Sequence, residues 1–124
     1  MMKQILALML AGMAGTLCRY GITLLPWPKG FACGTLAVNL LGAFLAGFCY
    51  IWLNGKFPQH SAWFPVLFVG FFGAFTTFST FMLDSAKYLT AGNYGLFTAN
   101  ILLQNILGIG CVLGGIALAH KTVL

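Results

Sequence analysis

The stretch GFFGAFTTFSTFMLD, residues 70–84, places a cluster of hydroxyl residues among phenylalanines inside a hydrophobic run. The hydroxyl residues are Thr76, Thr77, Ser79 and Thr80. In a helix, Gly73 is about 1 kcal/mol less favourable than alanine, and the β-branched threonines add a smaller cost. The stretch therefore indicates one of two structures. Either a helix breaks near its middle, or a continuous helix has hydroxyls that bond back to its own carbonyls.

The composition assigns the chain to the membrane. Of its 124 residues, 60% are hydrophobic and only 6% are charged, whereas soluble domains carry roughly 25% charged residues. Asp84 is the only acidic residue, and the six Lys and Arg residues are scattered singly. A soluble surface and a basic nucleic-acid patch are both excluded, and the chain is predicted to be an integral membrane protein.

Four segments have the length and apolar character that a transmembrane helix needs. They cover approximately residues 4–25, 32–53, 62–90 and 95–119. Clusters rich in proline, glycine and asparagine separate them, at PWPKG (26–30), NGKFPQH (54–60) and TAGNYG (90–95). We therefore expect an all-α membrane protein with a single four-helix transmembrane domain over residues 1–124.

The distribution of Lys and Arg does not indicate which way the four spans are oriented in the membrane. An even number of spans places Lys3, Lys56 and Lys121 on the side of the termini. Lys29 and Lys87 lie on the opposite side of the membrane. Arg19 lies inside the first span, nearer to that opposite side. Cytoplasmic loops normally carry an excess of Lys and Arg, and this even distribution predicts insertion in both directions. Two opposed copies can then pair as a dual-topology antiparallel homodimer, the two-chain form of an inverted repeat.

Polar and small residues recur on one face of three of the expected helices. They are Gly12, Gly15, Thr16 and Arg19 in the first, Thr35, Asn39, Ala43 and Gly47 in the second, and Asn100, Gln104, Gly108 and Cys111 in the fourth. Such faces pack helices closely and bond amides across them. Polar groups at membrane depth also line ion paths. For the three amides, both interpretations stay open.

The charged residues inside or beside the spans also allow alternatives. Arg19 either snorkels to the interface or attracts anions into a vestibule. Asp84 can pair with Lys87 one turn along, or with Arg19 of a neighbouring chain. The groups inside the spans are amides, hydroxyls and a guanidinium, all hydrogen-bond donors, and they favour an anion over a cation. No catalytic constellation is present, so an enzyme is excluded.

Several motifs in this chain are similar to one known family. They are G-x-x-x-R at 15–19, G-T-L-x-V-N-x-x-G at 34–42, G-F-x-G-x-x-T-T-F-S-T-F at 70–81 and N-I-L-L at 100–103. Together they resemble the Fluc/CrcB fluoride-channel family over essentially the whole chain. The resemblance implies a passive, fluoride-selective channel that exports F⁻ from the bacterial cytoplasm. It also implies an inner-membrane location and an antiparallel homodimer with two pores.

The resemblance further implies roles for individual residues. Backbone carbonyls of Gly73 and Thr76 would ligate a structural Na⁺ at the dimer centre, where the third helices break. The pore residues would be Asn39, Phe78, Phe81, Ser79 and Thr80, with Thr35, Asn100 and Gln104 as further polar candidates and Arg19 near a vestibule. Relatives often have Tyr and Ser where this chain has Asn100 and Gln104, and both of these residues are polar, so a pore-facing role is retained.

Two other classes of protein serve as alternatives. A small multidrug-type dual-topology transporter also has four short helices, but it needs a carboxylate within the membrane, and Asp84 lies near a span end. The second alternative is an accessory membrane subunit held together by small-residue packing. For such a subunit, an unbroken third helix is expected. The shape of the third span therefore discriminates between the channel and the accessory subunit.

Overall fold

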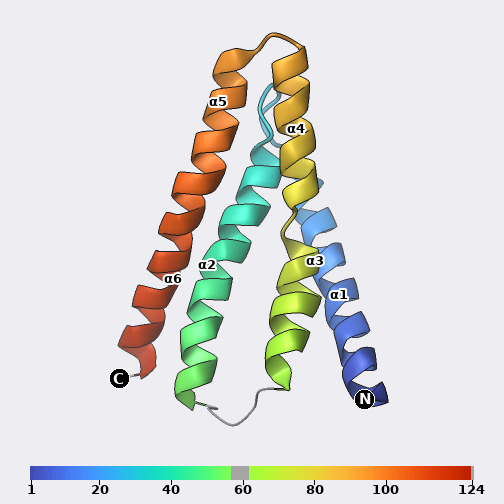
Figure 1. The fold of residues 1–124 in the computed structure, drawn as a ribbon, viewed down its shortest axis with the longest axis vertical. Coiled ribbons are helices and arrows are strands. Elements are labelled where there is room, and N and C mark those ends of the chain that lie inside the picture. Colours follow the sequence, from blue (N-terminus) through green and yellow to red (C-terminus); the bar gives the residue numbers. More distant parts are fainter. Residues whose placement is uncertain (57–61, 124) are drawn as a thin grey trace.

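The computed structural model of the chain describes residues 1–56 and 62–123, and these ranges are helical apart from short connections (Figure 1). The first span is α1 (Met2–Thr23), and the second is α2 (Cys33–Lys56). The third comprises η1 (Pro65–Phe72), α3 (Gly73–Phe75) and α4 (Phe78–Thr90). The fourth comprises α5 (Tyr94–Leu102), η2 (Leu103–Leu107) and α6 (Gly108–Val123).

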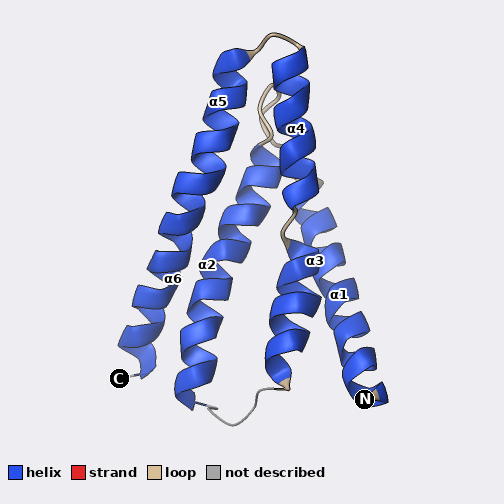
Figure 2. Ribbon diagram, viewed as in Figure 1, coloured by secondary structure: helices blue, strands red, loops and turns tan. Residues whose placement is uncertain are grey.

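Four helical runs are long and apolar enough to cross a membrane, which confirms the predicted fold class. The third run covers Pro65–Thr90 and the fourth Tyr94–Thr122, so the third begins later and the fourth ends later than the sequence indicated. Much of the predicted connection between the second and third spans, at 54–60, lies outside the described residues. Both termini lie at one end of the bundle, and Figure 2 shows no strand in the part of the chain that is described.

Glycines allow the helices to approach closely at two interfaces. On α2 and α6, Gly47 lies against the backbone of Val112, and Gly115 lies against the carbonyl of Phe44. On α1, Gly15 lies against the carbonyl of Phe71 in η1. A side chain at any of these positions would collide with backbone, so these small residues are packing positions of the kind that membrane helices use.

The third span is broken near its middle, as the sequence indicated, and the extended residues are the threonine pair. Gly73 is helical, with φ −62° and ψ −34°. The extended residues are Thr76, with ψ 159°, and Thr77, with φ −146° and ψ 103°. The unfavourable glycine therefore does not interrupt the helix. The interruption lies at the β-branched pair, which adopts extended backbone readily and finds hydrogen-bond partners there.

The threonines of the break bond in different ways. The Thr76 hydroxyl donates to the Phe72 carbonyl at 2.8 Å, so one hydroxyl bonds back to its own helix. The Thr77 hydroxyl oxygen accepts from the Thr80 backbone N–H at 3.3 Å, and the Thr77 hydroxyl donates to the Thr80 hydroxyl at 2.9 Å. Thr77 is therefore the N-cap of α4.

Removal of this cap is expected to destabilise the protein. Thr77→Val keeps the shape and β-branching but loses the hydroxyl, and loss of an N-cap costs about 1 kcal/mol. Thermal unfolding in detergent should show a lower midpoint for Thr77→Val and a midpoint near that of the wild type for Thr77→Ser, which keeps the cap. Equal midpoints for the valine and serine variants would contradict the capping role.

Candidate functional site

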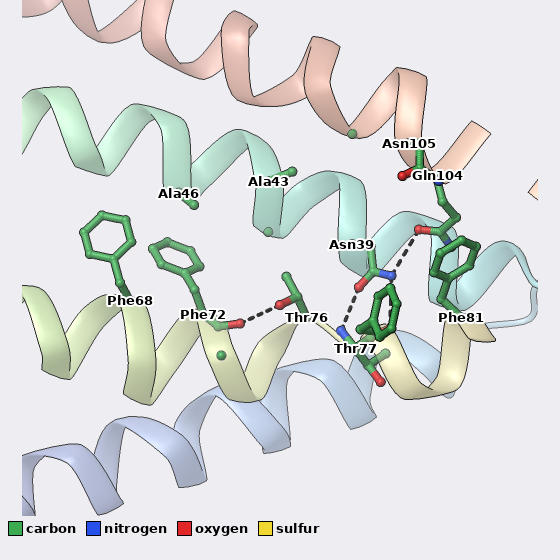
Figure 3. Close-up of a pocket in the computed structure, with 14 residues that line it drawn as sticks. Asn39, Ala43, Ala46, Phe68, Phe72, Thr76, Thr77, Phe81, Gln104 and Asn105 are labelled. Atoms are coloured by element: carbon green, nitrogen blue, oxygen red, sulfur yellow. Dashed lines mark hydrogen bonds between the residues drawn. The ribbon is translucent and has the colours of Figure 1, made fainter. Parts of the chain in front are cut away.

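The side chain of Asn39, on α2, holds the break in the third span (Figure 3). Its Oδ1 accepts from the Thr77 backbone N–H at 2.8 Å, and its Nδ2 donates to the Thr77 carbonyl at 3.2 Å. The same Nδ2 donates to Oε1 of Gln104, on η2, at 3.0 Å. One amide thus joins α2, the break and the fourth span.

These bonds fix the direction of both amides. The Thr77 N–H can only donate, so Asn39 must turn Oδ1 towards it and Nδ2 towards Gln104. Gln104 must then present Oε1 to Asn39, which leaves its Nε2 elsewhere. That Nε2 is buried and has no partner among the described residues, in a side chain that is only 9% exposed. A buried donor without a partner is rare in native proteins and calls for an explanation.

Asn100 lies one turn before Gln104 and is fully buried. Its Nδ2 donates to the Ser85 hydroxyl at 2.9 Å, and that hydroxyl donates to the Phe81 carbonyl at 2.8 Å. Because Ser85 uses its proton on Phe81, Asn100 has to offer its amino group. Its Oδ1 is left without a partner in the described part of the chain. Gln104 and Asn100 thus carry one spare donor and one spare acceptor.

A cavity of about 480 Å³ lies beside the break. Its polar lining includes Asn39, Thr76, Thr77, Gln104 and Asn105, and its aromatic lining includes Phe68, Phe72, Phe78 and Phe81. The rings of Phe78 and Phe81 lie edge to face, with centroids 5.9 Å apart. Phe81 is buried, whereas Phe78 is 73% exposed in the single chain. The cavity therefore combines amide donors with aromatic rings and has no acidic side chain in its lining.

A second cavity, of about 420 Å³, lies between α1 and the break. Arg19 lines it together with the threonines Thr16, Thr23, Thr35, Thr77 and Thr80. The guanidinium donates from Nη1 to the Thr76 carbonyl at 3.4 Å. This cavity thus has one cation and several hydroxyls. Because Thr77 lines both cavities, the break is their common wall.

Comparison with known proteins assigns the family. The model of the family described as "CrcB-like protein, Camphor Resistance (CrcB)" matches residues 6–116. The chain belongs to the CrcB family. It is 36% identical to the fluoride-specific ion channel FluC of Maridesulfovibrio salexigens, over 98% of this chain and 99% of that one. It is 39% identical to the FluC of Solidesulfovibrio magneticus, over 97% and 98%. The FluC of Legionella pneumophila strain Lens is 38% identical, over 96% and 91%.

This CrcB chain is a multi-pass membrane protein, and its broken third span argues against an accessory subunit, for which an unbroken helix is expected. Of the residues that the sequence singled out, the structure brings Asn39, Gln104, Phe78 and Phe81 to one cavity. It places Arg19, Thr35 and Thr80 at the other. Ser79 and Asn100 line neither cavity.

The acidic residue of this CrcB chain has two partners. Asp84 Oδ1 lies 3.6 Å from Lys87 Nζ, so of the two pairings that the sequence allowed, the structure shows the one along the helix. The Thr35 hydroxyl donates to Asp84 Oδ2 at 3.1 Å. Arg19 of the same chain forms no ion pair in the described ranges.

Sequence reasoning missed three residues that matter to the site. Thr77 caps α4 and binds Asn39, and the threonine doublet followed by Thr80 was a signal for it. Phe68 and Phe72 also line the first cavity, with ring centroids 5.7 Å apart. Their helical spacing of four residues, leading towards the break, could have indicated a shared face.

The carbonyls at the break have the chemistry of a hard-cation site. In a continuous helix the Thr77 N–H would bond to the Gly73 carbonyl, but here it bonds to Asn39. Among the described residues, the Thr76 carbonyl accepts only the long bond from Arg19. Neutral carbonyl oxygens freed by a broken membrane helix are ligands for Na⁺. Within the described residues, no cluster of three His, Cys, Asp or Glu side chains offers a metal site.

Proposed function

We propose that this CrcB chain forms a fluoride-selective passive channel in the bacterial inner membrane. The observation that carries the proposal is the cavity beside the break. Amide donors and phenylalanine rings converge on it, and no carboxylate lines it. The relatives named above are fluoride-specific channels and match over nearly their whole length. The small multidrug-type transporter fits less well, because Asp84 lines neither this cavity nor the one at Arg19.

Fluoride is small and strongly hydrated, so a narrow pore must replace its water with hydrogen-bond donors. Gln104 lines the cavity, and its buried Nε2 is a donor without a partner among the described residues. Asn39 uses its amino group on Thr77 and Gln104, and it can serve the ion only by exchanging one of these bonds. The positive edges of the Phe78 and Phe81 rings supply weak attraction without the tight binding of a full cation.

The cavity at Arg19 suits the role of vestibule. A guanidinium raises the local concentration of anions at a cleft, and the Thr35 and Thr80 hydroxyls offer further hydrogen bonds there. Because Arg19 is absent from the lining of the first cavity, it attracts an anion without trapping it between the phenylalanines. A fluoride ion would thus meet a charged entrance and then neutral donors.

The channel is proposed to be an antiparallel homodimer with two pores. Phe78 lies in the middle of a span and is 73% exposed, so the aromatic part of the site is open in one protomer. An opposed second copy can cover it, and the even distribution of cations permits that orientation. The Gly73 and Thr76 carbonyls of both protomers would then hold a structural Na⁺ at the centre. Bound there, the cation would offset the partial negative charge of the two helix ends.

Reconstitution in liposomes tests the function. Vesicles loaded with KF or KCl receive the purified protein and valinomycin, and ion-selective electrodes follow anion efflux. Fast, valinomycin-dependent F⁻ efflux without Cl⁻ efflux is expected. Phe78→Ile and Phe81→Ile should each slow F⁻ efflux about fivefold, because aromatic interactions contribute about 1 kcal/mol and about 1.4 kcal/mol corresponds to a factor of about ten.

The control for this assay is Phe97→Ile on α5, which changes the same side-chain type outside both cavities. It should leave efflux near that of the wild type. Gel filtration establishes that each variant elutes as the wild type does. Absence of F⁻ flux in folded wild-type protein would contradict the proposed function and favour the accessory subunit.

A further inference from the structure

We infer that Arg19 competes with the sodium ion for the Thr76 carbonyl and thereby lowers the sodium affinity of the break. The inference rests on the proposed sodium site. The vestibule role of Arg19 does not require contact with the break. The contact of Arg19 with Thr76 therefore needs a separate explanation.

The packing of α1 against the third span brings Arg19 to the break. Gly15 lies against the Phe71 carbonyl so closely that α1 is held in contact with η1 at this level. Arg19 comes about one turn after Gly15 in α1, and Thr76 comes a little more than one turn after Phe71 in the third span. Both residues therefore lie just beyond the contact between Gly15 and Phe71. The guanidinium therefore reaches the end of the first half-helix and donates from Nη1 to the Thr76 carbonyl at 3.4 Å.

Among the described residues, no carboxylate neutralises this guanidinium. In the described residues the one ion pair of Asp84 is with Lys87, and its other oxygen accepts from Thr35. The groups of opposite polarity near Arg19 are thus the Thr76 carbonyl and the negative end of the half-helix that finishes at Phe75. Carbonyl oxygens at this same helix end are the proposed ligands for sodium.

Two cations that share one carbonyl repel each other. A sodium ion on the Thr76 oxygen would lie beside the guanidinium, and like charges at such short range interact strongly in a medium of low dielectric constant. The long 3.4 Å bond shows that the guanidinium is not tightly held. Sodium can therefore displace it, but at reduced affinity. Removal of the positive charge at Arg19 should make sodium binding tighter.

The test is a sodium titration of the purified full-length protein in detergent, in a background of N-methylglucamine chloride. The readout is the thermal unfolding midpoint at each sodium concentration, which does not depend on channel activity. Arg19→Gln removes the charge and keeps an amide donor. We expect its half-saturating sodium concentration to fall about tenfold or more relative to the wild type. Arg19→Lys keeps the charge and should stay nearer the wild type.

The matched control is Lys121→Gln, which also removes one positive charge but at an exposed position near the C-terminus. Its sodium dependence should equal that of the wild type. An unchanged or weaker sodium affinity in Arg19→Gln would overturn the inference and make Arg19 a positioning residue. Arg19→Met offers a second neutral variant. Loss of the folded protein in both neutral variants, with Lys121→Gln intact, would likewise overturn it.

The sodium titration distinguishes a wrong sodium site from a wrong role for Arg19. If the wild type itself shows no sodium-dependent stabilisation, the sodium site is contradicted and the inference falls with it. If the wild type responds to sodium but Arg19→Gln binds it no more tightly, only the competition is wrong. Fluoride efflux, measured separately, reports on the channel function.

Discussion

Asn39→Leu is expected to reduce fluoride efflux about 100-fold or more. The substitution leaves the Thr77 N–H, the Thr77 carbonyl and Gln104 Oε1 without their present partner. Each buried polar group without a partner costs about 1–3 kcal/mol. If these costs together destabilise the functional conformation of the break by about 3 kcal/mol, the fraction of molecules in that conformation falls about 100-fold. Liposome efflux with a fluoride electrode measures the loss directly.

Two further variants separate the roles of Asn39. Asn39→Asp keeps an acceptor for the Thr77 N–H but removes both donated bonds and adds a negative charge, so it should conduct as poorly as the leucine variant. Asn93→Ala, at an exposed amide in the connection before α5, should conduct normally. Near-normal efflux in Asn39→Leu would show that neither the break nor the pore depends on this amide.

The second large effect is expected at the interface of α2 and α6, where Gly115→Ala should strongly destabilise the fold. A Cβ at position 115 would collide with the Phe44 carbonyl and would lie 2.8 Å from the Phe48 backbone nitrogen. Backbone cannot rotate out of the way as a side chain can, so the two helices must separate. Overpacking typically costs about 1–3 kcal/mol and occasionally more, and this contact belongs at the upper end.

Gly110→Ala is the matched control, because it adds the same methyl group to the same helix with no neighbour within 4 Å. Alanine is favoured over glycine in helices by about 1 kcal/mol, so this variant should be as stable as the wild type or more so. Thermal unfolding and the yield of folded protein in detergent compare the two. Equal stability of the two variants would contradict the close packing of α2 and α6.

The four spans were predictable because their signal is local. A run of about twenty apolar residues between proline and glycine clusters has few other structures available in a chain with so little charge. The packing role of Gly15 and Gly47 also followed from their helical spacing. These features depend on composition and periodicity, which a single sequence displays in full.

The position of the break was not predictable in the same way. Helix propensity marked both Gly73 and the threonine pair as unfavourable, and the backbone leaves the helix at Thr76 and Thr77 while Gly73 stays helical. The break falls at the threonine pair because Asn39, from another helix, binds the N–H and carbonyl of Thr77. The same tertiary contact occupies the amino group of Asn39 and leaves that of Gln104 spare. No periodicity within one helix could have shown which amide is free.

The common end at which both termini lie has a consequence for joining two copies into one chain. With an even number of crossings, a short loop from the last residue of one copy to the first of the next would fuse the copies in the same orientation. The antiparallel pair that we propose would instead need, on a single polypeptide, a connector that crosses the bilayer itself. A tandem gene built with a soluble linker should therefore assemble only through exchange between molecules, whereas one built with an extra hydrophobic helix should form the pair within one chain.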